Sequence, residues 1–156
     1  MISQQTLALV GGLLLTLAAV PAWAQTALPG GFEITLLPGY AYEPKQGFDS
    51  VVGVIEKKGG LKINFEMGNV PPPGAPVFGG SLVNQALRVR ENDRQWLKET
   101  TIGGRQIFVA HGKNDHLVVT STTAKEGINF HTEAKTPADI AEVLLMTLSF
   151  REGKGK

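Results

Sequence analysis

Cysteine is absent from this 156-residue sequence. The protein therefore has no disulfide bond, no thiolate metal ligand and no thiol nucleophile, and it cannot carry a lipid on a cysteine. Aromatic residues are also few, at 7% of the chain. Its stability has to come from the packing of aliphatic side chains and from hydrogen bonds.

A strong charge of either sign is missing as well. Fifteen Lys and Arg residues stand against 14 Asp and Glu residues, which gives a formal net charge of +1. Nucleic acids and anionic membranes attract proteins through an excess of basic residues, so neither is an expected partner. The one basic cluster, Arg151, Lys154 and Lys156, is interrupted by glycines and is typical of a solvated terminus.

No apolar run reaches the roughly 20 residues that cross a bilayer as a helix. The longest, residues 7–20, is uncharged and is followed by Pro21 and then by Ala22-Trp23-Ala24, although residues 1–5 lack the usual Lys or Arg. Small residues at positions 22 and 24 suit signal peptidase. The sequence therefore predicts a signal peptide over residues 1–24 and an exported protein, periplasmic or extracellular, without a stable membrane anchor.

The remaining residues, 25–156, are of ordinary size for a single domain. Their clearest pattern is a β-hairpin over residues 51–67, in which apolar and polar residues alternate after the turn Lys58-Gly59-Gly60. A three-residue turn would place Glu56 opposite Lys62 and would let Phe65 cover Gly53.

Farther along the chain, glycine-rich and polar turns separate four stretches of strand-like sequence. Strands are expected over residues 94–102, 105–111, 116–123 and 128–133. If the last two turns have four residues each, His111 faces His116, and His131 faces Thr120. Successive hairpins of this kind form an antiparallel meander.

An amphipathic helix is expected over residues 136–146. Thr136 can cap it, Pro137 suits its first turn and Asp139 favours the positive end of its dipole. The apolar stripe would face the sheet, and it consists of Ile140, Val143, Leu144 and Thr147. The fold class is therefore α+β: an antiparallel β-sheet built as a meander of hairpins, with a C-terminal α-helix packed on one face.

Four other segments complete the expected fold. Residues 25–31 are interpreted as a lead-in, residues 40–47 as a loop, and residues 148–150 as a last strand. Residues 81–90 fit a short helix and a strand equally well.

His111, Asp115 and His116 are the most plausible metal ligands, since imidazole and carboxylate groups bind zinc and copper. A closed site needs one more ligand, and His131 is the remaining histidine. In the expected register it lies about 13 Å from His116, out of reach. The sequence therefore predicts no metal site and no cofactor, and it offers no spacing of residues suited to catalysis.

Residues 70–80 are the expected interaction element. Pro71, Pro72 and Pro73 hold the chain extended, and Val77 and Phe78 give it an apolar tip that could dock on a partner. The alternative is that Phe78 folds back onto the domain as a plug.

Two resemblances accompany these patterns. The stretch Gly47-Phe48-Asp49-Ser50-Val51-Val52-Gly53-Val54-Ile55, continued by residues 60–68, resembles a group of small exported bacterial proteins of unknown function that share a GxDSxxGxI and GxxIxFxxG pattern. Glu66 stands where those proteins tend to have Asp. The order of an opening strand, a meander and a closing capped helix is similar to the PsbP and Mog1-like fold, which implies a fold and no function.

The sequence thus favours an exported soluble domain that is a non-catalytic binding or accessory module, with a protein or a small apolar ligand as its partner. The alternative is a small periplasmic hydrolase or metal-binding protein that uses the region of His111, Asp115 and His116. An enzyme would gather two or more of its candidate side chains in one cleft, whereas a binding module would show a concave apolar patch. Those candidates are Asp49, Glu66, His111, His116 and His131.

Overall fold

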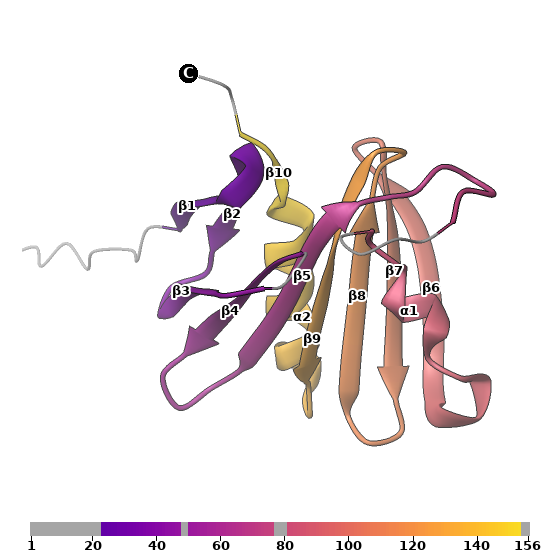
Figure 1. Ribbon diagram of the computed structural model, residues 1–156. Helices are drawn as coiled ribbons and strands as arrows, with labels where there is room; N and C mark the ends of the chain where they lie inside the picture. Colours follow the sequence, from indigo (N-terminus) through magenta and orange to yellow (C-terminus); the bar gives the residue numbers. More distant parts are fainter. Residues whose placement is uncertain (1–22, 48–49, 77–80, 154–156) are drawn as a thin grey trace, which may run out of the picture.

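The computed structural model describes residues 23–47, 50–76 and 81–153. Its main feature is a seven-stranded antiparallel sheet with the strand order β3-β4-β5-β9-β8-β7-β6 (Figure 1). The strands are β3 (Tyr40–Lys45), β4 (Val51–Lys57), β5 (Lys62–Asn69), β6 (Arg94–Ile102), β7 (Arg105–Gly112), β8 (His116–Thr122) and β9 (Glu126–Glu133). The last four form the predicted meander.

One face of this sheet is covered by the C-terminal helix α2 (Pro137–Ser149) and by a small three-stranded sheet. The small sheet consists of β1 (Ala24–Leu28), β2 (Phe32–Leu36) and β10 (Arg151–Glu152), with the 3-10 turn η1 (Pro29–Gly31) between β1 and β2. The core lies between these layers, and its largest fully buried side chains include Ile34, Ile63, Leu117, Phe130, Met146 and Phe150. The predicted α+β fold with a helix packed on one face is confirmed.

Helix α2 begins directly after Thr136, the residue that the sequence predicted as its N-cap. The hydroxyl of Thr136 accepts a hydrogen bond from the backbone N–H of Asp139 at 3.1 Å, and the Asp139 carboxylate accepts one from the backbone N–H of Thr136 at 2.9 Å. This reciprocal capping box pairs two backbone donors that a helix start leaves free.

The opposite face of the sheet is covered over β7 and β8 by residues 81–93. These contain the short helix α1 (Gln85–Arg88) and the 3-10 turn η2 (Glu91–Asp93). Buried Thr120 and Asn129 hold this segment in place: Thr120 Oγ1 accepts from Ala86 N, and Asn129 Nδ2 donates to Val83 O. Over β3, β4 and β5 no described helix covers this face (Figure 1).

The predicted hairpin is confirmed in its register. Glu56 pairs with Lys62 and Gly53 with Phe65 across β4 and β5. The Phe65 ring lies directly over Gly53, so a Cβ atom there would come within 2.6 Å of Phe65 Cζ.

Three of the expected segments differ from the structure. Residues 40–45 form strand β3 and not a loop, because Tyr40 and Tyr42 both turn toward the core while Pro44 is tolerated on an edge strand. All of residues 25–31 belong to β1 and η1 and do not form an irregular lead-in. Helix α2 continues to Ser149, so the last strand starts at Arg151 and not at residue 148.

The β7–β8 register is one residue away from the predicted one. The turn has three residues, 113–115, because Asp115 adopts a left-handed backbone conformation (φ 63°) that non-glycine residues seldom take. His111 therefore pairs with Leu117. A one-residue shift moves every β7 side chain to the other face, so Ile107, Val109 and His111 lie on the α2 side.

The β8–β9 register is two residues away from the predicted one. Thr123 N donates to Glu126 O at 2.8 Å, which closes a tighter turn than expected. His131 therefore pairs with Val118, and His116 pairs with Glu133. A shift of two residues keeps each side chain on its predicted face but moves His131 next to His116.

Candidate functional site

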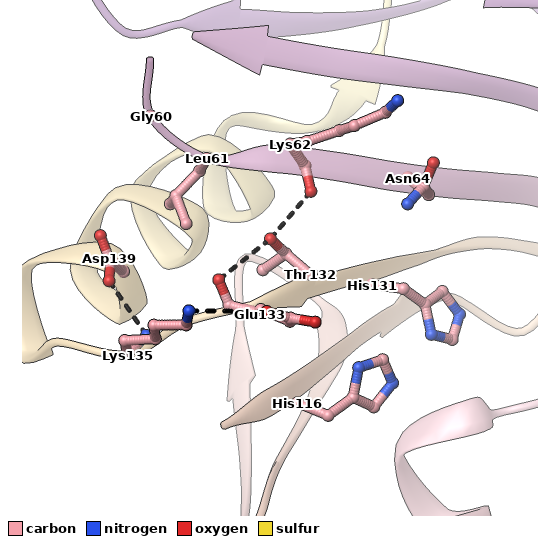
Figure 2. A pocket seen from close by; sticks show the side chains of 10 residues that line it. All are labelled: Gly60, Leu61, Lys62, Asn64, His116, His131, Thr132, Glu133, Lys135 and Asp139. Atoms are coloured by element: carbon pink, nitrogen blue, oxygen red, sulfur yellow. Dashed lines mark hydrogen bonds and ion pairs between the residues drawn. The ribbon is translucent and has the colours of Figure 1, made fainter. Parts of the chain in front are cut away.

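A cleft of about 600 Å³ opens at the end of the large sheet where β5 begins and β9 ends (Figure 2). It forms because the two strands separate there: their pairing begins at Asn64 and His131, and beyond it the Thr132 hydroxyl donates to the Lys62 carbonyl at 2.9 Å. The cleft is lined by Gly60, Leu61, Lys62, Asn64, His116, His131, Thr132, Glu133, Lys135 and Asp139.

Two imidazole rings lie side by side in this cleft (Figure 2). His116 comes from β8 and His131 from β9, with ring centroids 5.9 Å apart and ring planes at 26°. Neither ring forms a hydrogen bond with another of the described residues. Burial lowers the pKa of His131, and the neighbouring His116 lowers it further, so His131 stays neutral to lower pH than an exposed imidazole.

Acidic, basic and amide side chains surround the two rings. Glu133 lies opposite His116 in the ladder, and Asn64 lies opposite His131. The Glu133 carboxylate is 3.9 Å from Lys135 Nζ. The side chain of Glu133 is 72% exposed and that of Lys135 is 70% exposed. An ion pair that exposed holds its partners only weakly, so the Glu133 side chain is free to turn.

The predicted trio of His111, Asp115 and His116 is not a site. His111 lies on the α2 side of the sheet, where its ring stacks on Trp96 and its Nε2 donates to the Ala134 carbonyl at 3.1 Å. Asp115 lies in the turn, and its backbone carbonyl accepts from Ala134 N. Because the turn has three residues instead of four, His111 and His116 lie on opposite faces of the sheet.

The structure instead brings His116 together with His131, which the sequence analysis placed out of reach. Glu133 and Asn64 were not assigned to a site, although His131-Thr132-Glu133 puts two polar side chains on one face of a strand. Of the other candidates, Glu66 does not line the cleft, and Asp49 lies outside the described residues. Within residues 23–47, 50–76 and 81–153, no group of three His, Asp or Glu side chains stands ready to hold a metal ion.

A second, smaller cleft of about 320 Å³ lies between the small sheet and the far end of β5. Phe32, Val51 and Met67 give it an apolar wall, and Ser50 is among its polar lining residues. An apolar wall of this kind suits a small apolar ligand.

The proline-rich segment leaves the end of β5 and returns at Ser81, which bridges to Asn69. Pro72 and Pro73 are exposed, and Pro71 is half-buried. Val77 and Phe78 lie outside the described residues. The described part of the chain contains no helix that is both long enough and apolar enough to span a membrane.

No family model matches the sequence, and no curated protein does either. Among solved structures, the chain is similar to the solution structure of cyanobacterial PsbP (CyanoP) from Synechocystis sp. PCC 6803. The TM-score is 0.55 and the identity 12%, with 95% of this chain and 98% of that chain covered. At this identity the likeness shows a shared PsbP-like fold, as the element order predicted, and it assigns no activity.

Proposed function

We propose that this protein is an exported, non-catalytic binding or accessory module and that the cleft with His116 and His131 is its binding site. The observation that carries the proposal is the composition of this cleft. It combines imidazole, amide and ammonium groups with open volume, which suits the recognition of a polar ligand.

The same cleft lacks the relationships that catalysis requires. A catalytic imidazole is oriented by a carboxylate or carbonyl and lies within hydrogen-bond reach of a nucleophile or a proton donor. Among the described residues, neither His116 nor His131 has such a partner, and the Thr132 hydroxyl is directed to the Lys62 carbonyl instead. The PsbP-like fold is compatible with an accessory role.

One observation favours the alternative of a hydrolase: two of the candidate imidazoles share one cleft. The two functions are separated by assaying the mature protein with ester, phosphoester, peptide and glycoside substrates. We expect no turnover that depends on His131. Turnover that disappears in a folded His131→Ala variant, and persists in Glu66→Gln outside the cleft, would replace the proposal with the hydrolase.

Binding is tested by native mass spectrometry of the protein released from its own compartment. We expect a non-covalent ligand that is retained by the parent and by Glu66→Gln and is lost from Asn64→Ala, since Asn64 lines the cleft opposite His131. Equal retention by both variants would place the ligand elsewhere.

The segment with Pro71, Pro72 and Pro73 is the proposed contact with a partner protein, with Val77 and Phe78 as its apolar tip. Exposed prolines lose little conformational entropy on docking, which supports this role. Replacing Phe78 with Ser should leave stability within about 0.5 kcal/mol. A loss of several kcal/mol would show that Phe78 is part of the core.

A further inference from the structure

We propose that His116 and His131 form a binding site for a divalent transition-metal ion, with Glu133 as the third protein ligand. This inference rests on the proposed function, because it names the ligand class of the same cleft. Three features of the cleft support it: the separation of the rings, their free nitrogens, and the position of Glu133.

The separation of the two rings suits a shared ion. A metal–imidazole bond is about 2 Å long and the nitrogen lies roughly 1 Å from the ring centre, so two imidazoles on one ion have centroids up to roughly 6 Å apart. The observed distance is 5.9 Å. Figure 2 shows the two rings next to each other in the cleft. Rotation of the two side chains would direct one nitrogen of each ring to a common point.

The free state of both rings adds a second argument. A buried structural histidine normally gives at least one ring nitrogen to a protein group, as His111 gives its Nε2 to the Ala134 carbonyl. The rings of His116 and His131 make no hydrogen bond to any described residue, and they line an open volume. Their lone pairs are therefore available to a ligand.

Glu133 is placed to complete the set. It pairs with His116 across β8 and β9 and lies two residues after His131, so all three side chains project from one face. Its carboxylate contacts Lys135 only at 3.9 Å and is largely exposed. In the structure the three side chains are not gathered around one point. The proposal therefore requires the Glu133 side chain to turn toward the rings, which would give a His₂Glu set with a position left for water.

The chemistry of this set selects the class of ion. Two neutral imidazoles and one carboxylate suit zinc and copper(II), whereas magnesium and calcium require mainly oxygen ligands. Lys62 and Lys135 line the same cleft and oppose a cation electrostatically. The bonds to the imidazoles, rather than the charge of the cleft, therefore have to provide the affinity.

The test uses untagged mature protein that has been stripped of metal with a chelator. Calorimetric titration with zinc should show one ion per chain, and magnesium should show none. His116→Gln and His131→Gln should each weaken zinc binding at least about tenfold, and Glu133→Gln should weaken it less. Glu66→Gln, a matched change outside the cleft, should bind zinc as the parent does.

Cobalt(II) provides a readout that does not depend on affinity. Bound at a His₂Glu site, it should give the visible absorption bands of a low-symmetry nitrogen and oxygen environment, and these should disappear in His131→Gln. No zinc binding by the parent, or equal binding by parent and His131→Gln, would overturn the metal site. If native mass spectrometry still finds another ligand in the cleft, the binding module stands without the metal.

Discussion

At the scale of single residues, Glu142 shows how a side chain can join two elements. Helical spacing alone places it on the solvent side of α2. In the structure its carboxylate accepts hydrogen bonds from the Tyr40 hydroxyl at 2.5 Å and from Lys57 Nζ at 3.0 Å. The hydrogen bond from Tyr40 is the main cause that lowers the pKa of Glu142, while burial and this bond raise the pKa of Tyr40. The cluster ties β3 and β4 to α2.

Replacing Glu142 with Gln should therefore reduce stability at neutral pH, by at most about 1 kcal/mol because the pair is partly exposed. The folded-state pKa is lowered, so the carboxylate stabilises the protein above the ordinary pKa of Glu and loses this effect as the pH falls through the lowered value. Urea denaturation at pH 7 and pH 3 should show the difference from the parent shrinking at pH 3. Exposed Glu99→Gln should have no effect, and a difference that is constant with pH would contradict this account.

Gly53 is required because the rings of Phe65 and Tyr42 occupy the space that a side chain at position 53 would need. A Cβ atom there would lie 2.6 Å from Phe65 Cζ and 2.9 Å from Tyr42 Cε2. Gly53→Ala should cost about 1–3 kcal/mol through this crowding. In a Phe65→Leu background the same change should cost clearly less, since the residues interact directly. Denaturation of the four proteins of this cycle measures the coupling, and additive effects would contradict the contact.

At the scale of the element, an apolar stripe holds α2 against the core, and the helical periodicity of the sequence predicted part of this stripe. Val143 and Thr147 are buried, while Ile140 and Leu144 lie at the edge of the core. Met146 is only 1% exposed, although it was not assigned to the stripe. Leu145, the next residue toward the N-terminus, is 46% exposed.

These adjacent apolar residues allow a matched test of the helix orientation. Met146→Ala should destabilise the protein by about 2–5 kcal/mol, because it leaves a cavity in the core. Leu145→Ala should change stability by less than about 0.5 kcal/mol. Thermal or urea unfolding measures both, and equal costs would mean that α2 is rotated about its axis.

At the scale of the whole molecule, the predicted signal peptide over residues 1–24 can be tested directly. Cleavage after Ala24 would leave β1 paired with β2 from Gln25 opposite Thr35 onward. If the protein is exported as proposed, mass spectrometry of the protein from the periplasm or the medium should find a chain that starts at Gln25. Ala24→Glu, which places a charge where signal peptidase needs a small residue, should accumulate as the precursor. A parent protein that begins at Met1 and stays in the membrane would refute export.

Local interactions explain which parts of the fold could be predicted. The β4–β5 hairpin follows from strict alternation and a glycine turn, and α2 follows from Thr136 and Asp139 acting within one helical turn. Strand β3 could not be predicted in this way. Tyr40 and Tyr42 become strand residues because β4 and the core lie beside them.

The sequence by itself determined the α+β class, the meander, the hairpin register and the helix cap, because each depends on residues close together in the chain. The tertiary structure decided the candidate site. Asp115 adopts a left-handed backbone conformation, which the sequence does not indicate because no glycine stands at that position. The turn between β8 and β9 is two residues shorter than its composition suggested. Register in a sheet is set by such turns and by the burial of a whole face. Only the folded chain could therefore place His111 and His116 on opposite faces and bring His131 beside His116.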